Sequence, residues 1–368
     1  MSALTREAVL EALAQVEDPT FKKPMLELGT LLDVVVEAEQ VRASVRLTAP
    51  SDELQEAIRQ RIQAALAPLG AAQVTLDWDL QVPTRDVGQE DPIPNVRNVI
   101  LVMSGKGGVG KSTTSVNLAL ALKRSGARVG LLDADIYGPS IPTMLGIQGF
   151  PNSEDGKTIE PLERFGIKLM SIGFLMEDTK AAIVWRGPML HGALQQFLGD
   201  VHWGELDYLV MDLPPGTGDV ALSLAQKMKV TGAVIVTTPQ EVALQDVYKS
   251  VSMCEKLSIP ILGVVENMSF FVDSAGVKQY LFGEGGGQRI AEFAKAPLLG
   301  QVPLEPKVRE WGDKGTPIVQ AFPASDSAQV FSRIADTLTE IIAQRHFERQ
   351  GGGKAPATSG PRRLKIVR

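Results

Sequence analysis

Few residues in this chain can bind a metal through sulfur or imidazole. Cys254 is the single cysteine among 368 residues, so one chain can form neither an intramolecular disulfide nor an all-cysteine metal site. The three histidines are scattered through the sequence without the spacing of metal ligands: His191, His202 and His346. A disulfide-stabilised scaffold is therefore excluded.

Long apolar segments and an excess of positive charge are also absent. No apolar run approaches the roughly 20 residues of a membrane span, and the N-terminus has no signal-peptide pattern, so we expect a cytoplasmic protein. The formal net charge of −6 argues against general nucleic-acid binding, which normally needs a strongly basic domain. With 44% hydrophobic and 22% charged residues, the composition is that of a globular protein, long enough for one large and one small domain.

A glycine-rich segment carries the strongest chemical signal. The apolar run 99–103 predicts a buried strand, and Ser-Gly-Lys-Gly-Gly-Val-Gly-Lys-Ser-Thr-Thr at 104–114 leads from it into a predicted helix. Glycines let backbone N–H groups converge on a polyphosphate, and the helix N-terminus adds its positive end. We expect Lys111 to reach the β- and γ-phosphates of a nucleotide and the Ser112 hydroxyl to bind Mg²⁺. The predicted nucleotide-binding residues of this loop are Gly105, Lys106, Gly107, Gly108, Val109, Gly110, Lys111, Ser112 and Thr113.

Lys106 is not demanded by the basic phosphate-loop pattern. It places a second cation directly after the first glycine, although the loop already has Lys111 for its own nucleotide. One interpretation is a solvated loop lysine. The other is a lysine that crosses a dimer interface and touches the nucleotide of the partner subunit.

Three carboxylates follow predicted buried strands. Asp133 and Asp135 come after the strand 128–132, where they can serve Mg²⁺ and the attacking water or instead cap the following turn. We assign the water to Asp135, because phosphoryl transfer needs orientation and charge neutralisation more than a strong base. Asp212 ends the strand 207–212, where a further carboxylate on the metal side is needed. The predicted metal ligands are Ser112, Asp133 and Asp212, and the predicted catalytic residues are Lys106, Lys111 and Asp135.

Two more residues are expected to touch the nucleotide. Gly216 lies in the turn after Asp212, where its N–H can bind the γ-phosphate, so that this turn is ordered by the triphosphate and relaxes after hydrolysis. Asn267 follows the strand 261–266, and its amide can recognise the edge of adenine through a paired donor and acceptor. Asparagine also ends many strands for purely structural reasons, so only its place in the sheet supports this role.

The sequence also predicts the domain organisation. Residues 1–80 predict a small α+β domain, and 81–97, with three prolines and no periodic pattern, predict a linker. Residues 98–348 alternate apolar strands with helices, which predicts a mostly parallel doubly wound sheet with its ligand at the carboxyl ends of the strands. Residues 349–368 predict a disordered basic tail, either solvated or in contact with an anionic membrane or nucleic acid.

The predicted elements have the following bounds. In the small domain, we expect helices at 7–16 and 51–67 and strands at 31–36, 41–47 and 73–78. In the large domain, the predicted strands are 99–103, 128–132, 167–172, 207–212, 231–237, 261–266 and 298–301. The predicted helices are 111–125, 189–199, 219–228, 240–257, 286–295 and 326–347.

In their order, these motifs resemble the Mrp/ApbC family of iron–sulfur cluster carrier ATPases. This family belongs to the deviant-Walker P-loop NTPases, with MinD, ParA and the nitrogenase iron protein. The resemblance extends from about residue 97 to 345. It rests on the phosphate loop with its extra lysine and on the segments 133–140, 185–189, 203–208, 212–219 and 266–269. The N-terminal module is similar to the small iron–sulfur assembly domain of many bacterial members, through Asp18-Pro19 and Leu28-Gly29.

The resemblance implies a function. It implies a Mg²⁺-dependent ATPase that acts as a homodimer with two nucleotides at its interface and helps to load iron–sulfur clusters onto apoproteins, with cluster scaffold proteins as further partners. Lys106 matches the lysine that reaches the partner's nucleotide, Asp135 the catalytic switch aspartate and Asn267 the base-contacting asparagine. A second interpretation is a MinD- or ParA-like positioning or partition ATPase without a cluster, against which the acidic net charge and the attached small domain argue. A metabolic kinase would need an acceptor site, and none is visible.

The chain departs from the family at the place where the cluster is held. Cluster-carrying members have a Cys-x-x-Cys shortly after the Glu-Asn-Met-Ser segment, but here Phe-Val-Asp-Ser-Ala-Gly stands at 271–276. Cys254 lies among apolar residues of a predicted helix and is expected in the core. Asp273 could offer oxygen, which suits a thiolate-preferring cluster poorly. An iron–sulfur cluster would need unusual ligands or a partner that supplies them.

Overall fold

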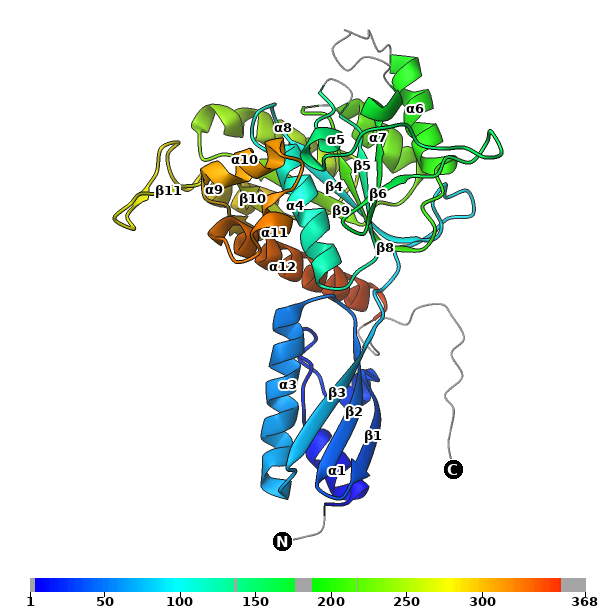
Figure 1. The fold of residues 1–368 in the computed structure, drawn as a ribbon, viewed down its shortest axis with the longest axis vertical. Helices are drawn as coiled ribbons and strands as arrows, with labels where there is room; N and C mark the ends of the chain where they lie inside the picture. The colour runs from blue at the N-terminus through cyan, green and yellow to red at the C-terminus, as the bar shows by residue number, and fades with distance from the viewer. Residues whose placement is uncertain (1–3, 136–137, 176–186, 217, 352–368) are drawn as a thin grey trace. The chain divides into compact units, whose positions relative to one another are not determined.

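The computed structural model describes residues 4–135, 138–175, 187–216 and 218–351 (Figure 1). Trp185 and Arg186 of one family segment, Thr217 in the turn after Asp212, and the basic tail from residue 352 lie outside the described residues. Contacts divide the chain into two compact units: residues 4–84 with 339–351, and residues 85–338. The domain boundaries drawn from the sequence, including those of the linker 81–97, stay a prediction.

The small unit is built on a three-stranded sheet. Its strands are β1 (Leu31–Glu37), β2 (Gln40–Leu47) and β3 (Gln73–Leu80), in the order β1-β2-β3. β1 pairs with β2 antiparallel, and β2 pairs with β3 parallel. The helices are α1 (Arg6–Leu13), α2 (Met25–Leu28), α3 (Asp52–Leu66) and the 3-10 helix η1 (Ala67–Leu69).

Helix α3 shows why the sequence folds this way. The Ser51 hydroxyl accepts a hydrogen bond from the Leu54 N–H at 3.0 Å, which caps the first turn as the sequence predicted. The apolar side chains that α3 buries recur every four residues: Leu54, Ile58, Ile62 and Leu66. The 3-10 turn that follows ends at Gly70, whose φ of 76° is left-handed and costs glycine little.

The large unit is built on an eight-stranded sheet. Its strands are β4 (Val96–Ser104), β5 (Val129–Asp133), β6 (Leu162–Arg164), β7 (Ile167–Ser171), β8 (Leu206–Asp212), β9 (Gly232–Thr237), β10 (Ile261–Glu266) and β13 (Leu298–Gln301). The strand order is β13-β10-β9-β4-β8-β5-β7-β6, and only β6 pairs antiparallel to its neighbour. A separate hairpin is formed by β11 (Phe271–Val272) and β12 (Lys278–Gln279).

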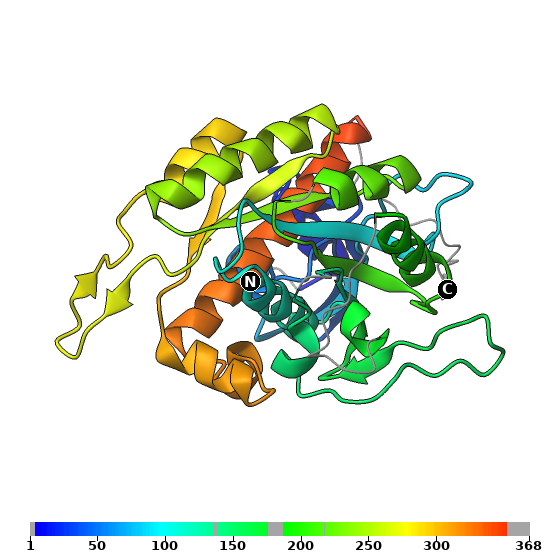
Figure 2. The ribbon, with the colours of Figure 1, turned by 90° about the horizontal axis from the view of Figure 1, so that it is seen from above.

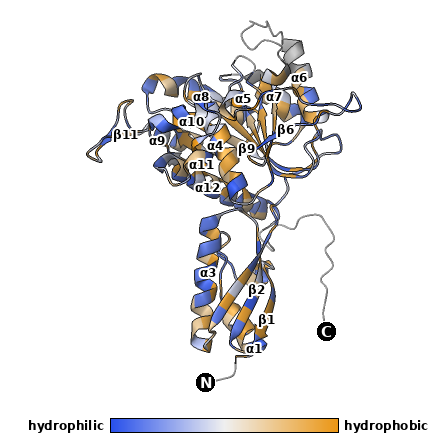
Figure 3. Cartoon of the chain, in the orientation of Figure 1, coloured by the Kyte–Doolittle hydropathy of each residue, from blue (hydrophilic) through white to orange (hydrophobic). Residues whose placement is uncertain are grey.

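Helices cover both faces of this sheet. The helices of the large unit are α4 (Lys111–Arg124), α5 (Ile141–Met144), η2 (Ile172–Leu175), α6 (Gly187–Gly199), α7 (Gly218–Lys227), α8 (Glu241–Lys256), α9 (Gly286–Ala294), α10 (Pro306–Asp313), α11 (Ile318–Ala321) and the first part of α12 (Asp326–Arg349), whose residues from 339 onward belong to the small unit. Figure 2 shows α8 and α9 on one face of the sheet and α4 with α10 on the other. All seven residues of β8 are buried, which explains its continuous apolar run, and Figure 3 shows the same hydrophobic character along the central strands. The predicted fold class, a mostly parallel doubly wound P-loop sheet with a small α+β domain, is confirmed.

The predicted linker contains a buried ion pair. The Arg85 guanidinium, of which 2% is exposed, donates two hydrogen bonds to the Asp91 carboxylate. The same guanidinium also donates to the backbone oxygens of Ile93 at 3.0 Å and Lys229 at 3.2 Å. Residues 85–93 are therefore fixed to the large unit just beyond the end of α7.

The sequence did not predict several short elements. Helix α10 has eight residues, and its large apolar side chains are Val308 and Trp311, too few to establish a helical period from the sequence. The hairpin strands β11 and β12 have two residues each, too few to show an alternation. Among the residues that the structure describes, no helix combines the length and the apolar character needed to cross a membrane.

Candidate functional site

The phosphate loop connects the end of β4 to the start of α4. Gly108 and Gly110 have φ values of 81° and 83°, a left-handed conformation that other residues adopt at a cost. Gly105 is required for a different reason: a Cβ built there would lie 2.4 Å from the backbone of Asp246 and Val247. The loop is thus pressed against α8, and glycine is the one residue that allows this approach.

Lys111 lies between two carboxylates. Its Nζ is 2.8 Å from Asp212 Oδ2 and 3.2 Å from Asp135 Oδ2. The side chains of Lys111 and Asp212 are 6% and 0% exposed, so the attraction acts with little screening by water. A cation held this way is positioned to exchange its carboxylate partners for phosphate oxygens.

Ser112 and Asp212 form an oxygen pair at the start of α4. The Ser112 hydroxyl donates to Asp212 Oδ2 at 2.5 Å, and the Ser115 hydroxyl donates to Asp212 Oδ1 at 2.7 Å. Because two hydroxyls bind its two oxygens, the carboxylate is held in one orientation, and the Lys111 carbonyl, 3.0 Å from the Ser115 oxygen, is an alternative acceptor for the Ser115 hydroxyl. Mg²⁺ prefers oxygen ligands such as hydroxyls and carboxylates, so the side chains of Ser112 and Asp212 fit such an ion.

Asp133 is fully buried beside Asp212 on the neighbouring strand. Burial first, and then the Asp212 carboxylate, raises the pKa of Asp133 to about 8. Its oxygens accept hydrogen bonds from the Ser171 hydroxyl at 3.0 Å and from the N–H groups of Asp135 at 3.2 Å and Ile141 at 3.4 Å. Asp133 therefore holds the segment that carries Asp135, and its predicted role as a metal ligand stays a prediction.

A cavity of about 240 Å³ lies over the phosphate loop. It is lined by residues of the loop, the segment after β5 and the turn after β8: Ser104, Lys106, Gly107, Gly108, Gly110, Lys111, Ser112, Thr113, Asp135, Gly138, Ser140, Met144 and Pro215. The Lys106 side chain forms no ion pair or hydrogen bond within the described part of the chain. Its predicted contact with a partner's nucleotide is untested by this geometry.

The turn after β8 lies against the phosphate loop. The Gly216 N–H donates to the Ser104 carbonyl at 3.0 Å, and a Cβ on Gly216 would be 3.2 Å from the Gly105 carbonyl oxygen. Gly216 also has a φ of 69°. The N–H predicted to bind a γ-phosphate is therefore near the loop but bonded to it, and it must change partner to reach a phosphate.

Asn267 reaches the phosphate loop from the end of β10. Its Nδ2 donates to the Val109 carbonyl at 2.9 Å, and 7% of the residue is exposed. The parallel strands β4, β5, β8 and β10 thus bring together at one sheet edge all the residues that the sequence predicted for the site.

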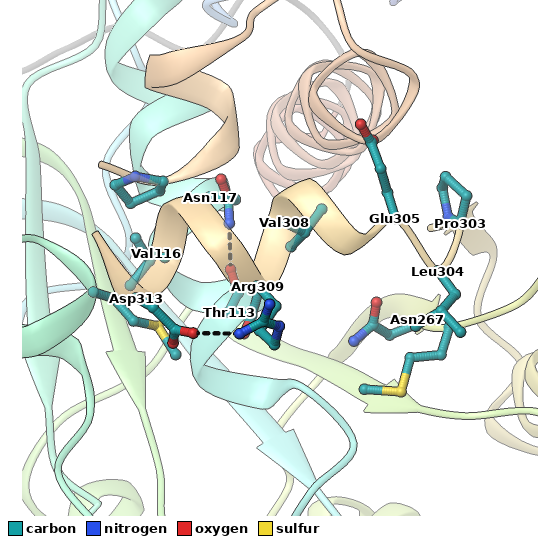
Figure 4. A pocket seen from close by; sticks show the side chains of 14 residues that line it. Thr113, Val116, Asn117, Asn267, Pro303, Leu304, Glu305, Val308, Arg309 and Asp313 are labelled. Atoms are coloured by element: carbon teal, nitrogen blue, oxygen red, sulfur yellow. Dashed lines mark hydrogen bonds and ion pairs between the residues drawn. The ribbon is translucent and has the colours of Figure 1, made fainter. Parts of the chain in front are cut away.

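Beside the loop lies a second cavity of about 240 Å³ that the sequence did not predict (Figure 4). It is lined by side chains of α4, α10 and the segments after β10 and β13: Thr113, Val116, Asn117, Met144, Asn267, Met268, Pro303, Leu304, Glu305, Val308, Arg309, Gly312, Asp313 and Pro317. The lining is mostly apolar, and the two cavities share Thr113 and Met144. The signal that could have found it was the position of 302–305 directly after a parallel strand, because such segments gather at the ligand edge.

The segment that replaces the family's cysteine pair forms the β11–β12 hairpin, which projects from the large unit in Figures 1 and 2. Asp273 closes its turn: Oδ1 accepts from the N–H groups of Ala275 and Val277, both at 2.9 Å, and Oδ2 accepts from Gln279 Nε2 at 3.1 Å. The hydrogen bond from Val277 is the main cause that lowers the pKa of Asp273. The Asp273 carboxylate therefore serves the turn.

Cys254 is a core residue. It is 0% exposed on α8, and its Sγ lies 3.7 Å from the sulfur of Met103. Burial raises the pKa of its thiol to about 12, so the thiolate that a metal needs is disfavoured. In residues 4–135, 138–175, 187–216 and 218–351, no group of three or more His, Cys, Asp or Glu side chains is arranged to hold a metal ion.

Comparison with known proteins gives consistent results. Residues 95–339 match the model of the ParA family, described as NUBPL iron-transfer P-loop NTPases, and residues 6–76 match that of iron–sulfur cluster assembly proteins. An iron–sulfur cluster carrier protein of Synechocystis is 46% identical over 348 residues, which cover 92% of this chain and 98% of that protein. The carrier protein of Escherichia coli is 44% identical over 348 residues, 93% of each chain.

Two solved structures resemble the large unit. A nucleotide-binding protein from Archaeoglobus fulgidus in complex with ADP has a TM-score of 0.53 and 40% identity over 63% of this chain and 95% of its own. The cell division ATPase MinD of Pyrococcus furiosus has a TM-score of 0.50 and 22% identity over 66% of this chain and 99% of its own. The MinD likeness is one of fold alone.

Proposed function

Because the chain belongs to the family of NUBPL iron-transfer P-loop NTPases, we propose that it hydrolyses ATP and helps to load iron–sulfur clusters onto apoproteins. The observation that carries the ATPase function is the meeting of Lys111, Ser112 and Asp212 at the start of α4. The cargo is supported by the relatives of similar length, which are named iron–sulfur cluster carriers. These relatives favour the carrier over a partition ATPase, since the likeness to MinD extends to the fold only.

Triphosphate binding follows from the cavity over the loop. Lys111 leaves Asp212 and Asp135 for the β- and γ-phosphates, and the backbone N–H groups of the loop hold the remaining oxygens. Ser112 and Asp212 would hold Mg²⁺, and the ion would neutralise charge on the phosphates. The adenine lies in the mostly apolar cavity beside Asn267.

Hydrolysis requires a positioned water rather than a strong base. Asp135 lies on the phosphate cavity at 3.2 Å from Lys111, which supports its role in orienting that water. Lys106 lines the same cavity, and in a homodimer it supplies its charge to the partner's nucleotide. The turn at Gly216 exchanges its bond to Ser104 for one to the γ-phosphate, so it reports the state of the nucleotide.

The iron–sulfur cluster is the cargo of this protein, and the residues that bind it have to be identified. In the described part of the chain, the one thiol is buried with a raised pKa and the hairpin carboxylate is used by its own turn. We therefore assign the cluster's thiolates to the partners, namely scaffold proteins and client apoproteins, with the ATPase controlling their encounter. A cytoplasmic location stays a prediction from the sequence.

Transfer and iron binding test this function together. Purified chain is mixed anaerobically with a cluster-loaded scaffold protein and an apo iron–sulfur protein, with ATP and Mg²⁺ or with ATP and EDTA. We expect faster cluster transfer and phosphate release with Mg²⁺, whereas an unchanged transfer rate contradicts the carrier function. Reconstitution of the chain alone with iron and sulfide is expected to leave no stoichiometric cluster, and a stable cluster would contradict the assignment of its ligands to partners.

A further inference from the structure

The Asn267 side chain and the phosphate loop fit each other closely. The Asn267 amide donates to the Val109 carbonyl at 2.9 Å, and Val109 is 1% exposed. A Cβ built on Gly110 would lie 2.0 Å from Asn267 Nδ2, closer than any real contact. Gly110 is thus required not only by its φ of 83° but also by the amide that occupies the space beside it.

Asn267 is itself held on a rigid frame. Its N–H donates to the Thr237 carbonyl of β9 at 2.8 Å. The preceding residue, Glu266, is fully buried and accepts three hydrogen bonds from three different segments. These come from the Ser269 hydroxyl at 2.5 Å, Gln301 Nε2 at 2.8 Å and the Gly287 N–H at 2.6 Å. The amide of Asn267 therefore has a defined position even without a nucleotide.

We propose that Asn267 is a positioning residue of the phosphate loop, in addition to any contact it makes with the base. The Val109 carbonyl and the Gly110 N–H belong to one planar trans peptide, so they point in opposite directions. When Asn267 fixes the carbonyl, it also aims the Gly110 N–H away from itself, and Gly110 lines the phosphate cavity. The inference rests on the proposed binding of a nucleoside triphosphate at this loop.

A positioning role and a base-reading role differ in their ligand dependence. A residue that only reads adenine changes the affinity for ATP and leaves a base-free phosphate chain unaffected. A residue that shapes the loop changes the affinity for every ligand that uses the loop, by a similar factor. Inorganic tripolyphosphate, ATP and GTP together separate the two roles.

The experiment measures the dissociation constants of these three ligands with Mg²⁺ by calorimetry on the full chain. In Asn267→Ala, we expect the affinity for tripolyphosphate to fall about five- to tenfold, the effect of one lost hydrogen bond, and the affinities for ATP and GTP to fall by at least this factor. Asn267→Asp keeps the shape but loses the donor, so its loss is expected to be at least as large. This isosteric variant keeps the test open if the alanine variant folds poorly.

Asn98 provides a matched control on the same strand as the loop. It is a buried asparagine near the start of β4, and its Nδ2 donates to the Asp207 carbonyl at 3.3 Å. Asn98→Ala is expected to lower thermal stability without changing tripolyphosphate affinity. The proposal is overturned if Asn267→Ala weakens ATP alone, or if it weakens none of the ligands. If the wild-type chain binds no triphosphate, both the proposed ATPase function and the positioning role are refuted. If the wild type binds tightly and Asn267→Ala binds equally well, only the positioning role is refuted.

Discussion

The phosphate loop and the β11–β12 hairpin both follow strands of the same sheet, yet they differ in how many groups converge on them. At the loop, the Lys111 cation contacts the carboxylates of Asp135 and Asp212, and the hydroxyls of Ser112 and Ser115 bind Asp212. At the hairpin, Asp273 organises its own turn, and the hairpin with the two residues after Gln279 exposes four large apolar side chains: Val272, Val277, Tyr280 and Leu281. The phosphate loop therefore gathers reactive groups of the chain itself, whereas the hairpin presents an exposed, partly apolar surface.

This difference separates ATP hydrolysis from direct cluster binding, the two activities that the family resemblance implies together. The residues for phosphoryl transfer meet at the loop, whereas the thiolates expected for direct cluster binding are absent from the sequence after Glu266. Buried charges are costly unless they are paired, so a network such as that around Lys111 indicates a role that needs it. We infer that the nucleotide switch is intrinsic to this chain and that the cluster's thiolate ligands come from its partners.

The largest effect is expected from Lys111→Ala. This variant removes the cation that pairs with Asp212 and Asp135 and that the proposed function assigns to the phosphates. We expect triphosphate binding to weaken strongly and phosphate release to fall by about 10³-fold or more. Calorimetry and a phosphate-release assay measure both effects. Lys256→Ala removes an exposed lysine at the end of α8 and serves as the control. If Lys111→Ala hydrolyses ATP as fast as the wild type, Lys111 has no part in the reaction.

Lys106→Ala is expected to separate binding from hydrolysis. Because its amine is assigned to the partner's nucleotide, nucleotide binding should stay largely intact while the dimer-dependent part of turnover is lost. If Lys106 acts like an arginine finger supplied in trans, the loss approaches about 10³-fold. The measurement is the rate of phosphate release as a function of protein concentration. Unchanged turnover at every concentration would falsify the assignment in trans and favour a solvated loop lysine.

The parts of the nucleotide site were unequally predictable from sequence. The strand β8 was predictable because all its residues are buried, and the meeting of Lys111 with Asp212 was expected because parallel strands end at one edge. The bond from Asn267 to Val109 was not, since it depends on how two loops 158 residues apart approach each other. Leu304 and Val308 of the second cavity were missed because Leu304 lies in a short segment between two elements and the eight residues of α10 are too few to establish a helical period.

Restoring a cysteine pair in the hairpin tests whether thiols are all that this region is missing. Asp273 and Gly276 have the spacing of a Cys-x-x-Cys, and no atom lies within 4 Å of a Cβ built on Gly276. The double variant Asp273→Cys, Gly276→Cys is expected to gain iron after anaerobic reconstitution. Occupancy should be partial, because position 276 has a φ of 79°, which glycine adopts freely and cysteine adopts with strain. Iron counting and absorption spectra report the gain.

The matched control for this graft carries serine at both positions. Asp273→Ser, Gly276→Ser imposes the same loss of the Asp273 turn and the same strain at Gly276 without thiols. Iron in the cysteine variant and none in the serine variant would show that the hairpin can present ligands. Equal iron in the two variants would refute the idea that thiols alone distinguish this region from the loop.

The smallest effect is expected from Cys254, whose thiol is buried and bonded to neither region. Cys254→Ser places a hydroxyl beside Met103 and should cost about 1–3 kcal/mol of unfolding free energy, while Cys254→Ala avoids that buried polar group. Iron content after reconstitution should not change in either variant. In the wild type, a thiol reagent is expected to react only after unfolding, because the thiol is 0% exposed.

The pH dependence of stability gives a further readout of Cys254. Burial raises the pKa of its thiol from 9.0 to about 12 in the folded chain, so the folded state favours the protonated thiol. The stability that this preference contributes is complete below pH 9 and is lost as the pH rises through about 12. Cys254→Ala should lack this part of the alkaline destabilisation in urea titrations. Two results together would contradict this view: a Cys254 thiol that reacts in the folded chain at neutral pH, and iron that the wild type binds but Cys254→Ser does not. They would identify Cys254 of α8 as a cluster ligand, and cluster binding would then no longer be separate from the ATPase unit.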